Sequence, residues 1–375
     1  MQLRSKLMLS KNLILEGVPG TGKTFAFKHN IIKTWSENWG DDNNARQCQK
    51  DAPAITMHPS TSYEDFIEGL RPSSETEPPN RRIPIKESNN DEISIPEQGW
   101  FFNPPKATSG NFNAVDGFFT QVCQDAVLNP DKDFIVLLDE INRCNIPSVF
   151  GDLLTAIEKS KRAQWTNIDD ENGYWDLSKA QVITLAISKR LFFVPENVYI
   201  VGTMNTTDRS VAPMDMALRR RFAFTRLWPM GFAPSNIMSE DILPEQFKPS
   251  LRTHLTPSIH LYFQLNSKLK EHGPDALLGH SYLFDLAADI ETFGNISSNI
   301  SAVIQHHWNH NILPQVADII RSYQLKNILE SICNKNELCI NNQDVNYYIA
   351  NQNDHQNGRL LNPQLHLQVY ETPVT

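Results

Sequence analysis

An eight-residue segment near the amino terminus constrains the fold of this chain more than any other feature. Residues 17–24 read GVPGTGKT, which is the phosphate-binding P-loop pattern GxxxxGK[ST]. The apolar run Leu13-Ile14-Leu15 precedes it, and a helix-compatible stretch runs from Phe25 to Trp35. A buried strand, a glycine-rich turn and a helix in this order point backbone N–H groups at an anion. The sequence therefore predicts a strand–loop–helix unit that binds phosphate, and this context argues against a chance glycine-rich loop.

Two residues at the end of the loop carry the expected chemistry. Lys23 supplies a positive charge for the β- and γ-phosphates, and the Thr24 hydroxyl is placed to ligate Mg²⁺. The residues expected to contact the nucleotide are Gly17, Val18, Pro19, Gly20, Thr21, Gly22, Lys23, Thr24 and Phe25.

Five strand-like runs alternate with helix-compatible segments and predict an α/β fold, with a mostly parallel sheet covered by helices on both faces. The runs are Asn12–Glu16, Ala54–Met57, Phe134–Leu138, Val198–Gly202 and Phe222–Leu227. The run 134–138 is apolar throughout, as in a strand that is buried on both faces. We expect a large nucleotide-binding subdomain over residues 1–232.

Two segments interrupt this subdomain. Residues 73–98 are rich in Ser, Pro, Asn, Glu and Arg and are expected to form a surface insertion. Residues 163–197 form the second insertion. It contains an expected hairpin, with Val182–Ile187 and Leu191–Val194 on either side of residues 188–190.

Beyond residue 232 the strand signals fade. Amphipathic patterns over Ser258–Lys270 and Ile300–Leu329 predict helices, so residues 233–332 are expected to be a small helical subdomain. The tail, residues 333–375, is rich in Asn and Gln, and its pattern predicts no structure.

A second motif follows the apolar run 134–138. The predicted strand ends in Asp139-Glu140, roughly 115 residues after the P-loop. Asp139 is expected to bind the Mg²⁺ coordination shell, and Glu140 to polarise a water for attack on the γ-phosphate. Acidic residues after a strand are common, but together with the P-loop they predict a nucleotide hydrolase. The pair Asp-Glu favours the AAA+ branch of P-loop proteins.

Polar residues also follow the predicted strand 198–202. Asn205 is placed to hydrogen-bond the attacking water or the γ-phosphate. Asp208 and Arg209 come next. They belong either to the nucleotide site or to local structure, where they would cap the following helix or pair with each other.

Three consecutive arginines, residues 219–221, end a predicted short helix, Pro213–Leu218. Cations are favourable at a helix carboxyl end, so a local structural role is one interpretation. The other is that one arginine reaches the γ-phosphate held by a neighbouring subunit and stabilises developing charge there.

These motifs resemble those of McrB-like AAA+ motor subunits of modification-dependent restriction systems. The resemblance covers roughly residues 10–330 and rests on GVPGTGKTF, HPSTSYEDFIEGLRP, LLDEINRCNIPSVFGDLLTAIEKSKR, VPENVYIVGTMNTTDRS and MDMALRRRFAF. Gly279-His280-Ser281-Tyr282 and the helix from Trp308 to Ile320 also resemble family elements. In the loop from His58 to Arg71, the residues Tyr63, Glu64 and Asp65 are expected to pack and cap.

The resemblance implies GTP hydrolysis with Mg²⁺ and assembly into hexameric rings. It also implies a McrC-like partner with a PD-(D/E)xK nuclease domain, which docks on the ring, stimulates hydrolysis and cuts DNA. By motif match, Asn142 and Asn205 help to position the water, Asp208 belongs to the nucleotide site, and Arg220 or Arg221 acts in trans. An ATPase of another complex and a non-hydrolysing scaffold remain the alternatives, because nothing in a P-loop reads the base.

The chain departs from the family before the P-loop. Full-length members carry a DNA-binding domain there, whereas the P-loop strand begins at about residue 12 in this sequence. We therefore expect DNA to be recognised by another subunit or by the tail.

Composition excludes several other classes. A formal net charge of −9 argues against a basic surface all round, so contact with DNA is expected through the complex. No apolar run reaches 18 residues, and no signal peptide is evident, so a cytoplasmic protein without membrane spans is expected. The five cysteines, residues 48, 123, 144, 333 and 339, are scattered, as in a reducing compartment. His306 and His310 lack a third ligand, which disfavours a zinc site.

Overall fold

The computed structural model describes residues 3–37, 47–48, 52–72, 83–87, 92–94, 112–169, 172–208, 214, 216–233, 246–293, 300–325, 332–333, 339–342, 345–351 and 365–370. The chain divides into two compact units. The first comprises Met1–Glu16 and Lys23–Arg226, and the second comprises Gly17–Gly22 and Leu227–Thr375. The second unit's main segment begins at Leu227, close to the predicted boundary after residue 232. The turn of the P-loop, Gly17–Gly22, also belongs to the second unit.

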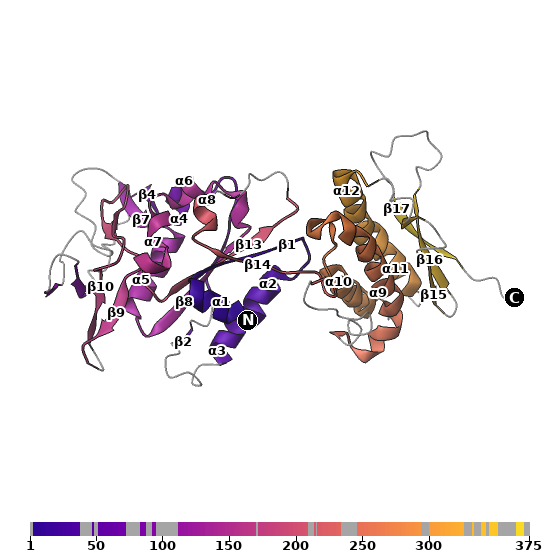
Figure 1. Cartoon of the computed structure of the whole chain (residues 1–375), viewed down its shortest axis with the longest axis horizontal. Helices are drawn as coiled ribbons and strands as arrows, with labels where there is room; N and C mark the ends of the chain where they lie inside the picture. The colour runs from indigo at the N-terminus through magenta and orange to yellow at the C-terminus, as the bar shows by residue number, and fades with distance from the viewer. Residues whose placement is uncertain are drawn as a thin grey trace. The chain divides into compact units, whose positions relative to one another are not determined.

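The first unit is built on a six-stranded sheet of order β14-β1-β13-β8-β2, in which β3 also pairs with β8 (Figure 1). Its strands are β1 (Asn12–Gly17), β2 (Gln47–Cys48), β3 (Ala54–Thr56), β8 (Lys132–Asp139), β13 (Val198–Asn205) and β14 (Ala223–Arg226). β1 is parallel to β14, and β2, β3 and β13 are each parallel to β8. All five predicted strands are present, so the predicted parallel sheet is confirmed.

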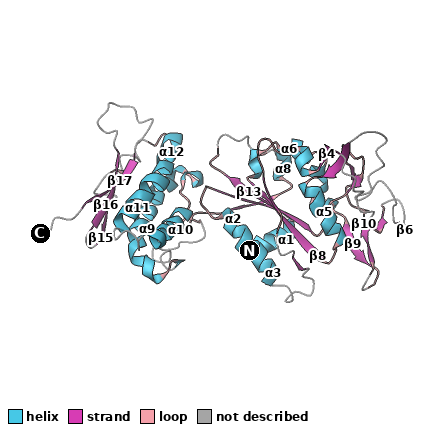
Figure 2. Cartoon of the chain, turned by 180° about the vertical axis from the view of Figure 1, so that it is seen from behind, coloured by secondary structure: helices cyan, strands magenta, loops and turns pink. Residues whose placement is uncertain are grey.

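Helices cover both faces of this sheet. In Figures 1 and 2, α2 and α3 lie on one side of the strands, and α5, α6 and α8 lie on the other. The helices of this unit are α1 (Leu3–Ser10), α2 (Lys23–Ala26), a π-helix (Phe27–Lys33), α3 (Thr34–Glu37), α4 (Tyr63–Phe66), α5 (Phe118–Leu128), α6 (Ile146–Phe150), α7 (Leu153–Ala156) and α8 (Met216–Arg219), with 3₁₀ turns at Ile141–Arg143 and Lys159–Lys161. Because both faces are covered, residues 134–138 of β8 are all buried, which explains their unbroken apolar run.

The two predicted insertions contribute strands to one small sheet. Its order is β6-β5-β10-β9, with β5 (Ile85–Lys86), β6 (Ile93–Ser94), β9 (Gln164–Asn167) and β10 (Gly173–Asp176). Ile83 and Ile85 are buried, so this part of the first insertion is packed into the unit instead of lying on its surface. Isoleucines two residues apart share one face of an extended chain, which is why so few apolar residues suffice. The remaining residues of 73–98 lie outside the described part of the chain.

The hairpin predicted in the second insertion is confirmed. β11 (Ile183–Thr184) pairs antiparallel with β12 (Leu191–Phe192) around the predicted turn. A separate two-stranded antiparallel sheet, absent from the sequence prediction, is formed by β4 (Glu68–Pro72) and β7 (Phe112–Asp116).

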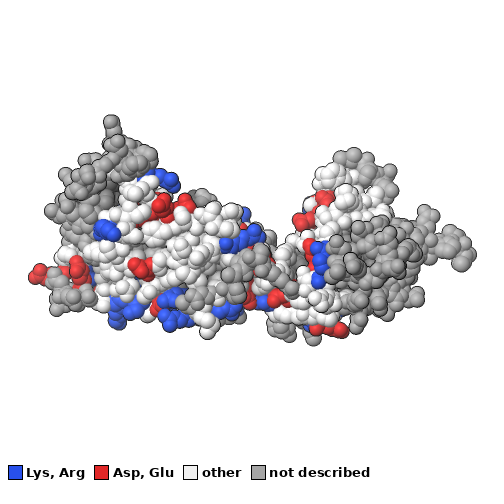
Figure 3. Space-filling view, turned by 90° about the horizontal axis from the view of Figure 1, so that it is seen from above, with Lys and Arg blue, Asp and Glu red and all other residues white. Residues whose placement is uncertain are grey.

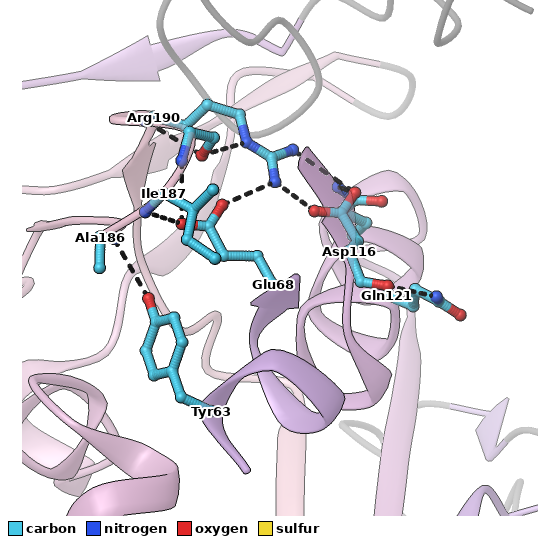
Figure 4. A network of polar contacts seen from close by, with 9 residues as sticks. Tyr63, Glu68, Asp116, Gln121, Ala186, Ile187 and Arg190 are labelled. Carbon is cyan, nitrogen blue, oxygen red and sulfur yellow. Dashed lines mark hydrogen bonds and ion pairs between the residues drawn. The ribbon is translucent and has the colours of Figure 1, made fainter. Parts of the chain in front are cut away.

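A buried polar network joins the β11–β12 hairpin to the β4–β7 sheet (Figure 4). The Glu68 side chain is fully buried, and it accepts hydrogen bonds from the N–H groups of Ile187 (2.6 Å) and Ser188 (3.0 Å). The Arg190 guanidinium lies between Glu68, at 3.4 Å, and Asp116, to which it is also bonded. The charge of this buried carboxylate is compensated by these partners, so the network links the turn of the β11–β12 hairpin to strands β4 and β7.

In the loop His58–Arg71, Tyr63 packs and Asp65 caps as expected. Ser62 and Asp65 form a reciprocal capping box at the start of α4. The Tyr63 hydroxyl accepts a hydrogen bond from the Ala186 N–H at 3.2 Å. Glu64 is exposed.

Helices form most of the second unit. They are α9 (Pro249–Leu269), α10 (Ser281–Phe293), α11 (Ile300–His307), a π-helix (Trp308–Ile312) and α12 (Leu313–Tyr323), with 3₁₀ turns at Lys270–His272 and Pro274–Ala276. α9 begins nine residues earlier than predicted, and α10 was not predicted at all. The predicted helix 300–329 is three consecutive helical segments that end at Tyr323.

The tail, which the sequence left without structure, forms a three-stranded antiparallel sheet. Its strands are β15 (Cys339–Asn342), β16 (Val345–Asn351) and β17 (Leu365–Tyr370). Ile349 and Leu367 are buried against the helices, and the Asn309 side chain accepts a 2.6 Å hydrogen bond from the Leu367 N–H. Strand pairing across residues 351–365 is long-range, so local composition did not indicate it.

Three further findings concern the surface and the thiols. None of the helices in the described ranges is both long enough and apolar enough to span a membrane. On the face shown in Figure 3, Lys and Arg side chains lie in separate groups among Asp and Glu. Cys123 and Cys144 are free thiols.

Candidate active site

The P-loop turn has the backbone that its glycines predict. β1 brings Leu13, Ile14 and Leu15, all fully buried, to the turn. Gly20 has φ +76° and Gly22 has φ +73°, a left-handed conformation that side chains disfavour. The Thr21 hydroxyl is buried and closes the turn by donating to Val18 O at 2.9 Å.

The helix after the turn begins with the three remaining predicted ligands. Thr24 and Phe25 are exposed, and the Phe25 ring stacks on His29 with centroids 4.1 Å apart. Burial lowers the pKa of Lys23 to about 8, and the carboxylates of Glu140 and Asp139 partly oppose this shift. The Lys23 ammonium therefore lies within electrostatic range of both acidic residues of the second motif, although 116 positions separate it from Asp139 in the chain.

Asp139 and Glu140 share a hydrogen-bond partner on the neighbouring strand. The Thr203 hydroxyl donates to the Asp139 carboxylate and accepts the Glu140 N–H at 3.0 Å. β13 and β8 pair in register up to Gly202 and Leu138, so Thr203 follows directly beside Asp139. Thr203 holds one carboxylate oxygen of Asp139. Carboxylate and hydroxyl oxygens are ligands that Mg²⁺ takes together with waters and phosphate oxygens, so Asp139 and Thr24 fit the ion chemically.

The Glu140 carboxylate is held on both oxygens. Its backbone is left-handed, with φ 54° and ψ 43°, which is uncommon for a residue other than glycine and turns the chain sharply at the strand end. Asn205 Nδ2 donates to Oε1 at 2.6 Å, and Arg143 Nε donates to Oε2 at 3.3 Å. Arg143 also lies 3.6 Å from the Asp208 carboxylate. Arg143 therefore links Glu140 to Asp208, two residues that the sequence analysis had assigned to the site on separate grounds.

Asn142 lies in the same cluster. Its Nδ2 donates to Asn205 O at 3.4 Å, whereas its buried Oδ1 has no hydrogen-bond partner among the residues that the structure describes. A buried acceptor without a partner is unfavourable unless a water or ligand group reaches it. Asn142 is thus placed to accept a hydrogen bond from such a group.

Two residues of this cluster, Thr203 and Arg143, were missed by sequence reasoning. Thr203 stands two positions before Asn205 on β13, so both side chains point to the same face of the sheet. That spacing was a usable signal once Asn205 had been selected. Arg143 gave no such signal, since its contacts depend on the turn at Glu140.

The three arginines at the carboxyl end of α8 differ in exposure and in contacts. The Arg220 side chain is 72% exposed and lies 3.9 Å from Glu158, whereas that of Arg221 is 8% exposed and pairs with Glu158 at 2.9 Å. Arg219 lies over the Phe224 ring at 5.5 Å. Arg209 and Pro213 lie outside the described residues.

The histidine pair expected not to bind zinc has its rings stacked, with centroids 4.2 Å apart for His306 and His310. Within the described ranges, no group of three or more His, Cys, Asp and Glu side chains is arranged to hold a metal ion.

Comparison with known proteins identifies the family. The AAA domain (dynein-related subfamily) matches residues 97–222, which include Asp139, Glu140 and Asn205. The "Type IV methyl-directed restriction enzyme EcoKMcrB subunit" of Escherichia coli (strain K12) is 31% identical over 281 residues, which are 74% of this chain and 48% of that protein. The chain is a McrB-like AAA+ protein. The resemblance inferred from the motifs is thereby confirmed.

A second relative comes from another restriction system. The "Type II restriction enzyme BsuMI component YdiS" of Bacillus subtilis (strain 168) is 27% identical over 228 residues, which are 58% of this chain and 57% of that protein. The McrB-like chain thus spans about half the length of the curated relatives it matches. A solved structure from Cytophaga hutchinsonii aligns with 86% of this chain and 87% of its own length, at 13% identity and a TM-score of 0.31. That similarity is too low to guide the description of single elements.

Proposed function

We propose that this chain binds and hydrolyses GTP with Mg²⁺ as the ring-forming motor of a restriction complex that contains a McrC-like nuclease. The observation that supports hydrolysis most directly is the cluster around Glu140. A carboxylate oriented by Asn205 and Arg143 lies near the Lys23 ammonium, which belongs to the P-loop motif. A base, a phosphate-binding cation and a metal-binding carboxylate are the groups that hydrolysis of a phosphoanhydride needs.

In the proposed mechanism, Lys23 and the backbone N–H groups of the P-loop bind the phosphates, and Thr24 and Asp139 hold the Mg²⁺. The bound ion would neutralise charge on the phosphate oxygens. Glu140 accepts a proton from water as the water oxygen bonds to the γ-phosphorus and the bond to the β-phosphate oxygen breaks. The products are the nucleoside diphosphate and inorganic phosphate.

Each carboxylate oxygen of Glu140 accepts one of the hydrogen bonds from Asn205 and Arg143 and keeps a second lone pair, and the more weakly held oxygen is the one we assign to accept that proton. The bond from Arg143 is the longer of the two, at 3.3 Å against 2.6 Å for Asn205. Asn205 then continues to orient the carboxylate, and Asn142 Oδ1 accepts a hydrogen bond from the water. Arg220, the more exposed of the two candidate arginines, would supply positive charge to a nucleotide held by a neighbouring subunit.

The test of this function compares nucleotides and oligomeric states. Purified chain with Mg²⁺ is expected to release phosphate faster from GTP than from ATP, and light scattering is expected to show assembly only with nucleotide. Faster release from ATP would overturn the choice of GTP. No release from either nucleotide, with the partner nuclease present, would overturn hydrolysis altogether. A strict monomer with a bound GTP analogue would contradict the ring.

The proposed partner rests on the relatives, which are described as a subunit and a component of restriction enzymes. A tagged copy of the chain is expected to retain a PD-(D/E)xK nuclease in the presence of GTP and Mg²⁺. DNA is expected to be bound and cut only by the complex. Cleavage by this chain alone would contradict that division of labour.

A further inference from the structure

One motif has no role in the mechanism above. Gly279-His280-Ser281-Tyr282 lies at the start of α10 in the second unit, which also contains the P-loop turn Gly17–Gly22. The two segments are in direct contact, and the contact is between backbones.

The first contact is a hydrogen bond from Ser281 to the P-loop. The Ser281 N–H donates to Gly20 O at 2.9 Å. Ser281 is the first residue of α10, so its N–H has no acceptor within the helix. The P-loop carbonyl therefore takes the place that a capping group would otherwise fill.

The second contact is a close approach at Gly279. A Cβ added there would overlap Pro19 O and would lie 2.5 Å from Gly20 O. On the other side, a Cβ added to Gly20 would lie 2.6 Å from Ser281 Oγ. Glycine at both positions, 20 and 279, is thus required for the two segments to approach this closely.

The motif is itself anchored within the second unit. Burial lowers the pKa of His280 to about 4, so the ring is neutral, and its Nδ1 accepts a hydrogen bond from Met230 N at 3.3 Å. The Tyr282 carbonyl accepts a hydrogen bond from Nε2 of buried His307 at 3.0 Å, and His307 contacts Asp289 at 2.7 Å. The segment that contacts the P-loop is therefore a fixed support.

We propose that Gly279 and Ser281 are positioning residues of the nucleotide site, which set the orientation of the P-loop peptide between Gly20 and Thr21. A peptide group is planar and trans, so its C=O and N–H point in opposite directions. With Gly20 O directed at Ser281, the Thr21 N–H points away from Ser281. Phosphates in a P-loop are bound by such N–H groups, so the bond from Ser281 prepares the loop for the anion.

This inference rests on the proposed function and is tested with the full-length chain and the fluorescent analogue mant-GTP. Ser281→Pro removes the N–H and the hydroxyl, at a first helical position where proline is tolerated, and Ser281→Ala removes the hydroxyl alone. The dissociation constant of Ser281→Pro for mant-GTP is expected to rise about tenfold, the loss of one hydrogen bond. KM is expected to rise by the same factor while kcat changes less than twofold. Ser281→Ala keeps the N–H, so it is expected to bind at least about fivefold more tightly than Ser281→Pro.

Gly279→Ala adds a methyl group against the P-loop and is expected to weaken binding by more than Ser281→Pro. The control is Gly273→Ala, which is strained because φ is +103° but whose added Cβ meets nothing within 4 Å, so stability is expected to fall while affinity for mant-GTP stays at the wild-type value. Circular dichroism verifies that each variant is folded. Wild-type affinity in folded Ser281→Pro and Gly279→Ala would overturn this inference and leave the proposed function standing. A wild-type chain that does not bind mant-GTP would overturn both.

Discussion

Asn205 donates a 2.6 Å hydrogen bond to Glu140 through its side-chain amide, across two neighbouring parallel strands. The two residues are 65 positions apart in the chain, and each had been selected as the polar residue at a strand end. Their pairing fixes the orientation of the carboxylate that we assign as the base. Variants of the residues around this pair separate its contribution to catalysis from its contribution to structure.

Glu140→Gln is expected to lower GTP hydrolysis by about 10²–10⁴-fold, since an amide cannot accept the proton from water. Affinity for mant-GTP is expected to stay within twofold, because Gln has nearly the same size and removes a negative charge near the phosphates. Phosphate release and equilibrium binding are measured on the same preparation. Glu64→Gln, an exposed glutamate in the described structure, is the matched control and should hydrolyse like wild type. Unchanged turnover in Glu140→Gln would refute the assignment of the base.

Thr203→Val replaces the hydroxyl by a methyl group of similar size and leaves the Glu140 N–H without its acceptor. Hydrolysis is expected to fall about 10–100-fold, the usual cost of losing a group that orients a metal ligand. Thr203→Ser keeps the hydroxyl and is expected to recover most of the loss. If valine and serine give equal rates, the hydroxyl has no orienting role. The Mg²⁺ concentration for half-maximal rate is the second readout, and it should rise only with valine.

Nucleotide affinity is expected to depend on the charge of Lys23. The pKa of about 8 in the free protein means that Lys23 is charged below pH 8 with or without nucleotide. Above pH 8, binding must take up a proton, because phosphates favour the ammonium, so affinity falls by up to about tenfold per pH unit. Calorimetry in two buffers of different ionisation enthalpy measures that uptake. Lys23→Met should lose both the affinity and its pH dependence, whereas Lys28→Met, on the exposed side of the π-helix, should keep both.

The same pKa affects stability in the opposite direction. In the unfolded chain Lys23 returns to about 10.5, so between pH 8 and 10.5 the unfolded state binds the proton more tightly. The contribution of Lys23 to the free energy of unfolding is therefore unfavourable below pH 8 and is relieved as the pH rises. Comparison of wild type with Lys23→Met over this range isolates the contribution. If the difference in free energy of unfolding between wild type and Lys23→Met does not change with pH, that result would contradict the lowered pKa of Lys23.

Arg190→Met leaves the buried Glu68 carboxylate without its cation. We expect a loss of about 3–5 kcal/mol in the free energy of unfolding, because an uncompensated buried charge remains. Urea denaturation followed by intrinsic fluorescence measures it. Lys189→Met changes the neighbouring exposed residue and should alter stability by less than about 0.5 kcal/mol. The double variant Arg190→Met/Glu68→Gln removes the buried negative charge together with its cation. If it is as unstable as Arg190→Met alone, loss of the ion pair is not the cause.

Arg220→Ala is expected to be inactive alone and to regain activity when it is mixed with Glu140→Gln. In a randomly mixed ring at equal amounts, about one interface in four combines an intact Glu140 with an intact Arg220 of the neighbour. Phosphate release should therefore return to about a quarter of the wild-type rate. Mixtures that stay inactive would place Arg220 outside the trans role. Arg219→Ala, which removes the contact with the Phe224 ring, is the control and should hydrolyse without mixing.

Much of the nucleotide site could be predicted from sequence because its parts are local. The P-loop needs only glycines at two left-handed positions and a lysine after them, and these features lie within eight residues. Asp139, Glu140 and Asn205 could be selected because each ends or closely follows an apolar run that had to be a buried strand. Chain order and parallel pairing then brought them to one edge of the sheet.

Other contacts depended on where distant segments meet. Thr203 and Arg143 acquire their roles only from strand register and from the left-handed turn at Glu140. The Ser281 N–H reaches Gly20 O only because the start of α10 packs against the P-loop turn. The sheet of the tail and the Glu68–Arg190 pair are likewise long-range.

Sequence by itself determined the class of this protein and the chemical groups that it can use. Local backbone preferences and apolar periodicity are properties of near neighbours, so they can be read along the chain. Tertiary structure alone decided which oxygen of Glu140 is held by which donor, and which segment supports the P-loop. Those contacts depend on angles and distances of closest approach between segments far apart in the chain. The P-loop identifies where phosphate binds, and its packing against Gly279 and Ser281 determines the orientation in which the loop is held.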